Sequence, residues 1–193
     1  MTTQTDPYPA RLEVDYQGEH DRLSTFFRLI WILPITVIVG FLSAAGEGLT
    51  CAVMLMILFR RKYPRWWLDF ALGLTRFEAR FAAYLALLTD RYPSTDEEQS
   101  VRLEIDYPDA ERDLNRWLPL VKWLLAIPHY VVLAFLVTGA AVAVLIAWFA
   151  VLFTGRFPRG LFDYVVGVGR WCLRVHAYAV LLTTDRYPPF SLT

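Results

Sequence analysis

The stretch RLEVDY at residues 11–16 recurs as RLEIDY at residues 102–107, and LTDRYP at residues 88–93 recurs as TTDRYP at residues 183–188. Between these stretches, Pro34, Asp69, Gly73, Arg76 and Arg80 match Pro128, Asp163, Gly167, Arg170 and Arg174 at one constant spacing. Self-similarity over a long period marks repeated structural units. The sequence therefore predicts two tandem copies, residues 8–93 and 101–190, joined by a polar linker at residues 94–100.

The two six-residue stretches alternate polar and apolar side chains, which is typical of a strand. We expect strands at 11–16 and 102–107 to pair as an antiparallel ribbon in the cytoplasm. An isolated two-stranded ribbon is marginally stable, so we also expect support from a partner subunit. Their acidic residues are spaced like solvent-facing strand residues, and with no histidine, lysine or metal constellation nearby we predict no catalytic role for them.

The composition favours a membrane protein. Hydrophobic residues make up 56% of the 193 residues and mean hydropathy is +0.36, which is more apolar surface than a soluble domain of this size buries. Lysine plus arginine and aspartate plus glutamate number 19 each. This balance gives no basis for electrostatic capture of nucleic acid.

Two long apolar runs carry the membrane signal. Residues 29–59 contain one charged residue, Glu47, and residues 123–153 contain none. A straight helix over either run would be about 46 Å long against a hydrocarbon core of about 30 Å. Glycines near 46–48 and 138–139 are candidate breaks, which predicts helical hairpins at residues 26–59 and 117–153. These hairpins would cross a thinned bilayer or enter and return without crossing.

The basic residues lie outside both runs and predict the orientation. Cytoplasmic segments retain lysine and arginine, and the flanks of the runs carry Arg60, Arg61, Lys62, Arg65, Arg156 and Arg159. The sequence predicts a multi-pass protein of the inner membrane with both termini and the linker in the cytoplasm. One helix per run is disfavoured, because it would place one basic flank outside.

Helices are predicted at residues 66–88 and 161–182, each with a narrow charged stripe. The stripes comprise Asp69, Arg76 and Arg80 in the first helix and Asp163, Arg170 and Arg174 in the second. Such helices suit the membrane interface. The stripes either form an inter-repeat ion network or anionic headgroup site, or are ordinary ion pairs and solvated faces. The Arg60-Arg61-Lys62 cluster either binds anionic lipid or sets topology alone, and both can hold at once.

No enzyme signature is evident. The chain lacks a glycine-rich phosphate loop and common hydrolase motifs, and its three histidines are scattered. We therefore predict no catalytic residue, no metal site and no cofactor. Cys51 and Cys172 lack the spacing of a redox pair or a metal knuckle.

Four stretches resemble a known family. They are YPARLEVDY at 8–16, AIPH at 126–129, WFAVLFTGRFPRGLFD at 148–163 and TDRYPPF at 184–190, and they look like the bacterial membrane proteins of domain-of-unknown-function family 4389. The first copy departs from the pattern at residues 60–62 and 66–68. The resemblance implies an integral membrane protein and supplies no catalytic residues.

These observations predict a non-enzymatic membrane accessory or scaffolding protein that binds anionic lipid, a membrane protein partner, or both. The main alternative is a small homo-oligomeric transporter or channel whose arginines Arg76, Arg80, Arg170 and Arg174 line an anion path. A membrane enzyme that uses Asp69 or Asp163 would need a polar pocket at membrane depth.

Overall fold

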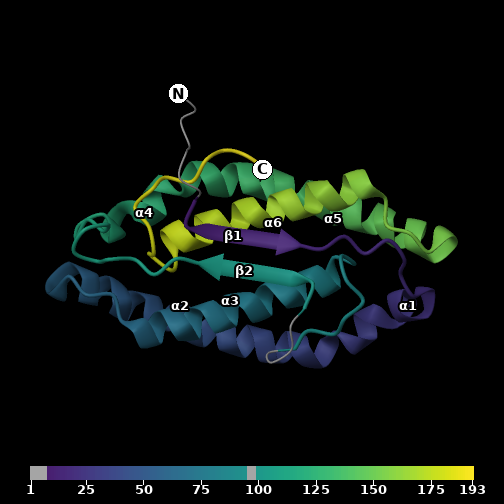
Figure 1. Ribbon diagram of the computed structural model, residues 1–193, viewed down its shortest axis with the longest axis horizontal. Coiled ribbons are helices and arrows are strands. Elements are labelled where there is room, and N and C mark those ends of the chain that lie inside the picture. Colours follow the sequence, from purple (N-terminus) through teal and green to yellow (C-terminus); the bar gives the residue numbers. More distant parts are fainter. Residues whose placement is uncertain (1–7, 95–98) are drawn as a thin grey trace.

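The computed structural model describes residues 8–94 and 99–193, and most of the predicted linker lies outside them. Each copy contributes one strand and three helices in the same order. The first copy holds β1 (Ala10–Val14), α1 (Arg22–Trp31), α2 (Leu33–Arg60) and α3 (Arg65–Leu85), and the second holds β2 (Val101–Ile105), α4 (Pro119–Leu125), α5 (Ile127–Thr154) and α6 (Arg159–Ala179). The strands lie centrally, with α2 and α3 on one side and α5 and α6 on the other (Figure 1).

The predicted antiparallel ribbon is confirmed, with Leu12 opposite Leu103 at its centre. β1 packs on α6 and β2 packs on α3, so helices of the same chain support the ribbon. The additional support expected from a partner subunit stays a prediction. Each strand therefore covers a helix of the other copy. Two core clusters combine residues of the ribbon, α3 and α6 with residues of α2 or α5.

The predicted hairpins at 26–59 and 117–153 are wrong. The glycines at 46, 48 and 139 lie inside the continuous helices α2 and α5, and the breaks fall instead at Ile32 and Ala126, just before Pro34 and Pro128. A glycine inside a helix costs about 1 kcal/mol, whereas proline lacks the N–H and clashes with the preceding turn. The proline therefore decides where the helix breaks. The hairpins that do form are α2 with α3 and α5 with α6.

The helices predicted at residues 66–88 and 161–182 are observed as α3 and α6. Both end a few residues early, before turns in which Leu87 and Leu182 have positive φ angles of 63° and 59°. Both leucines are nevertheless buried. These turns lead the chain into the repeated TDRYP segments.

The C-terminal ends of α2 and α5 give a matched test of helix capping. Both end in a left-handed residue, which is Arg61 (φ 48°) in the first copy and Gly155 (φ 74°) in the second. A side chain in this conformation costs about 1–2 kcal/mol. We expect Gly155→Ala to lower the free energy of unfolding by about 1 kcal/mol and Arg61→Gly to raise it by a smaller amount. Chemical denaturation of the purified variants measures both, and shifts of the same sign would contradict the explanation.

Candidate functional site

A buried arginine ties the end of the first copy to its start. Arg28 of α1 is 2% exposed and donates hydrogen bonds to the carbonyl oxygens of Tyr84 (2.8 Å) and Thr89 (3.0 Å). It also pairs with the Asp90 carboxylate and lies 4.4 Å from the centre of the Tyr84 ring. The guanidinium is thus held by a charge, two carbonyls and an aromatic face.

Asp90 has further donors. It pairs with His20 Nδ1 at 3.1 Å and accepts hydrogen bonds from the backbone N–H of Asp21 (3.0 Å) and the side chain of Gln17 (2.9 Å). Burial alone would raise the pKa of Asp90, but the bonds from His20 and Asp21 and the charges of His20 and Arg28 outweigh it and lower the pKa to about 2. Asp90 is therefore a fixed counter-charge.

The second copy repeats this arrangement with lysine in place of arginine. Lys122 Nζ lies 2.7 Å from Asp185 Oδ1, donates to the Thr184 carbonyl at 2.7 Å and lies 5.1 Å from the Tyr178 ring centre. The backbone N–H of Asn115 donates to Asp185, as that of Asp21 does to Asp90. We call the two sets of contacts the repeat anchors.

The tyrosine of each TDRYP segment completes its anchor. The hydroxyl of Tyr92 donates to the carbonyl of Trp31 at 3.4 Å, and the hydroxyl of Tyr187 donates to that of Leu125 at 3.1 Å. Both carbonyls lie at the helix breaks. The TDRYP repeat is thus explained by packing against these breaks. Arg28 and Lys122 were not predicted as site residues, although the two match at the same spacing as Pro34 and Pro128.

Four stripe arginines also bind main chain. Arg76 Nε donates to the Leu103 carbonyl (2.9 Å) and Arg170 Nε to the Leu12 carbonyl (3.0 Å), so each reaches the strand of the other copy. Arg80 donates to the Ser94 carbonyl, and Arg174 donates to the carbonyls of Ser191 and Thr193. These arginines therefore hold the strands, and the segments that follow the TDRYP repeats, against α3 and α6.

The remaining predicted site residues lie at the surface. Asp163 pairs with Arg159 at 3.2 Å, both more than half exposed, whereas Asp69 forms no ion pair in the described part of the chain. Arg65 and Arg159 lie over the rings of Tyr107 and Tyr16, 5.1 and 4.5 Å from the ring centres. Four basic residues at the C-terminal ends of α2 and α5 are exposed: Arg60 is the last residue of α2, Arg61 and Lys62 follow it, and Arg156 follows α5. The structure does not join the two stripes into one network.

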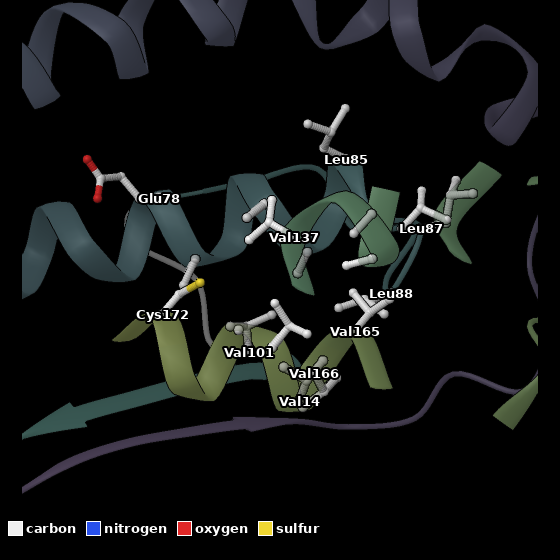
Figure 2. A pocket seen from close by; sticks show the side chains of 18 of the residues that line it. Val14, Glu78, Leu85, Leu87, Leu88, Val101, Val137, Val165, Val166 and Cys172 are labelled. Carbon is white, nitrogen blue, oxygen red and sulfur yellow. The ribbon is translucent and has the colours of Figure 1, made fainter. Parts of the chain in front are cut away.

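The structure also contains an apolar groove of about 870 Å³. It lies between α3 and the pair α5–α6, with residues of α1 and both strands also lining it. Figure 2 shows its mainly aliphatic walls, including Val137, Val165 and Val166, with Glu78 and Cys172 toward one end. The four stripe arginines do not line it.

Within the described residues, no group of three or more histidine, cysteine, aspartate or glutamate side chains is placed to hold a metal ion. His129 is buried, accepts a hydrogen bond from Trp171 Nε1 at 3.1 Å and stacks on Phe190. It packs in the core of the second copy, far along the chain from the His20–Asp90 pair of the first.

Comparison with known proteins supports the repeat. No curated protein and no solved structure matches the chain. Residues 22–95 and 117–191 each match one family, and each match runs from the first helix of a copy to just beyond its TDRYP segment. The chain therefore belongs to the family described as Domain of unknown function (DUF4389), of which it carries two tandem copies.

Proposed function

We propose that this protein is a non-enzymatic accessory or scaffolding protein embedded in the inner membrane. The supporting observation is the exposed apolar surface of α2 and α5, which are long and apolar enough to cross a membrane although only 18% and 17% of their most apolar stretches is buried. A core helix of a soluble protein is mostly buried. Phe41, Phe135 and Phe153 are 79%, 76% and 78% exposed, which suits lipid contact.

The charged ribbon limits the orientation that the helices can take in the bilayer. Its outer face carries exposed ion pairs between Arg11 and Glu104 and between Arg102 and Glu13. The ribbon lies beside the middle of α3 and α6, because Arg76 and Arg170 contact the central strand residues. If the helices stood upright across the bilayer, this charged face would lie at hydrocarbon depth, where each charge is costly.

The basic residues at the ends of the helices also argue against helices that stand upright across the bilayer. The C-terminal ends of α2 and α5 lie at opposite ends of the long axis (Figure 1). Lys62 follows α2 and Arg156 follows α5. An upright molecule would place one basic end on each side, against the preference of lysine and arginine for the cytoplasm. We therefore propose that the helices lie along the membrane within one leaflet, with the ribbon and both termini toward the cytoplasm. A helix is about 10 Å thick and half of the hydrocarbon core about 15 Å, so one helical layer fits.

Site-directed labelling tests this orientation. We expect Lys62→Cys and Arg156→Cys, each in a chain with Cys51 and Cys172 replaced by serine, to react with a membrane-impermeant maleimide in inside-out vesicles. Neither should react in intact cells whose outer membrane has been removed. Labelling of one position from each side would contradict the proposal and indicate upright helices.

Anionic lipid is the ligand class that the exposed basic ends favour. Each lysine or arginine near an anionic surface contributes about 1 kcal/mol, and Arg60, Arg61 and Lys62 are all exposed. The channel alternative needs guanidinium groups that face a water path. Arg76, Arg80, Arg170 and Arg174 instead donate to main-chain carbonyls. The accessory function is therefore better supported than the anion path.

Native mass spectrometry of protein purified with its surrounding lipid tests the accessory function. We expect either a stable complex with another membrane protein or specific retention of anionic phospholipid. Replacing Arg60, Arg61 and Lys62 with serine should weaken the lipid retention, and replacing Arg11 and Arg102 on the ribbon with glutamine serves as the control. A closed homo-oligomer without lipid would contradict the proposal and direct attention to flux assays.

A further inference from the structure

We propose that the apolar groove between α3 and the pair α5–α6 binds an acyl chain of a membrane phospholipid. The inference rests on the proposed membrane placement and adds an interior binding site to it. It concerns the hydrocarbon part of the lipid, whereas the basic ends of the helices concern the headgroup.

The lining of the groove favours hydrocarbon over a polar ligand. Its polar side chains include Arg28, Thr75 and Glu78, and each has a partner within the protein. Arg28 belongs to the first repeat anchor, Thr75 Oγ1 donates to the Ala71 carbonyl at 2.8 Å, and Glu78 accepts a hydrogen bond from Ser43. A polar solute that entered the groove would lose its hydrogen bonds to water, and the groove would not replace all of them, which is costly. An acyl chain makes no hydrogen bonds to water and therefore has no such cost.

The mouth of the groove opens onto the apolar surface assigned to lipid. Leu29, Leu85 and Leu145 line the groove and are 65%, 43% and 57% exposed, and Ala82 and Ala141 beside them are also exposed. A chain from the surrounding leaflet can therefore enter without crossing water. The volume of about 870 Å³ lies within the range of small-molecule sites. Apolar cavities are poorly filled by water, which leaves hydrocarbon as the better occupant.

The floor of the groove belongs to both copies. Leu12 and Val14 come from β1, Val101 and Leu103 from β2, and Val165 and Val166 from α6. An inserted chain would contact apolar atoms on both sides of the interface between the copies. Bound lipid would therefore stabilise the packing of one copy on the other.

Photocrosslinking tests the site. The full chain is reconstituted in vesicles that contain a phosphatidylglycerol with a diazirine in one acyl chain, and crosslinked peptides are mapped by mass spectrometry. We expect label in α6 around Cys172 and Leu173 and in α3 around Ala79. Replacing Ala82 and Ala141 with tryptophan should fill the mouth and reduce this label at least fivefold. Both positions are exposed, so folding should be retained.

The matched control replaces Ala44 and Ala134 with tryptophan, since both are exposed positions on α2 and α5 outside the groove. It should leave the inner label unchanged. Label confined to the outward faces, or an equal loss in both double variants, would overturn the proposal. Vesicle flotation distinguishes failure of the proposed membrane placement from failure of the proposed groove site. A wild-type chain that does not float refutes the membrane placement, whereas one that floats without inner label refutes the groove site alone.

Discussion

Replacing Asp90 with alanine is expected to lower the free energy of unfolding by about 3–5 kcal/mol, the range for removing one partner of a buried ion pair. The variant leaves the Arg28 guanidinium, 2% exposed, without its counter-charge. It also removes the acceptor for His20, Gln17 and the backbone N–H of Asp21. Denaturant unfolding in a fixed detergent, followed by circular dichroism, measures the change.

Asp163→Ala is the control, because Asp163 and Arg159 form an exposed pair one helical turn apart and such pairs contribute about 0.5 kcal/mol or less. Equal losses in both variants would contradict the role given to the anchor. Acid gives a second measurement. Because folding lowers the pKa of Asp90 to about 2, its stabilisation is complete above its unfolded pKa of about 4 and is lost as pH falls toward 2. The difference between wild type and Asp90→Ala should shrink over that interval.

Introducing aspartate at both Phe41 and Phe135 is expected to reduce the protein in the membrane fraction at least tenfold. The two residues occupy equivalent positions in α2 and α5 and are 79% and 76% exposed. A charged residue within the hydrocarbon costs about 3 kcal/mol on insertion scales. Quantitative immunoblotting of membrane and soluble fractions after equal expression gives the measurement.

Leucine at the same two positions should leave the membrane fraction unchanged, because it keeps the apolar surface while it removes the rings. If the aspartate variant were instead folded and distributed like the wild type, α2 and α5 would not contact hydrocarbon. The proposed placement would then fail for both copies at once.

The ribbon could be predicted from the sequence because its evidence is local. The alternation of RLEVDY and its near-identical recurrence specify two strands, and equal strands related by a two-fold axis pair in antiparallel register. The choice of helix on which each strand packs depends on contacts between residues far apart in the chain, such as Arg170 with Leu12. The strand pattern holds no information on that choice.

The helix breaks and the repeat anchors could not be predicted from the sequence, for two different reasons. The breaks were predicted at the glycines near 46–48 and 138–139, and only a comparison of the energetic costs of glycine and proline in a helix places them just before Pro34 and Pro128. Arg28 and Lys122 each precede an apolar run, and a lone basic residue in that position usually extends toward the membrane interface, so the local pattern does not predict that both are buried. Their carboxylate partners, Asp90 and Asp185, lie about 60 residues away in the chain, so the burial of these charges could be recognised only once the chain was folded.

The exchange of strands between the copies constrains how such a chain can be divided. A polypeptide with only the first copy would carry β1 but lack α6, on which that strand packs, and its α3 would lack β2. Two such polypeptides could satisfy each other by association through the same two-fold arrangement. In the present chain the segment between residues 94 and 100 joins the copies covalently, so what would otherwise be a concentration-dependent dimer is fixed as a single molecule with unequal halves.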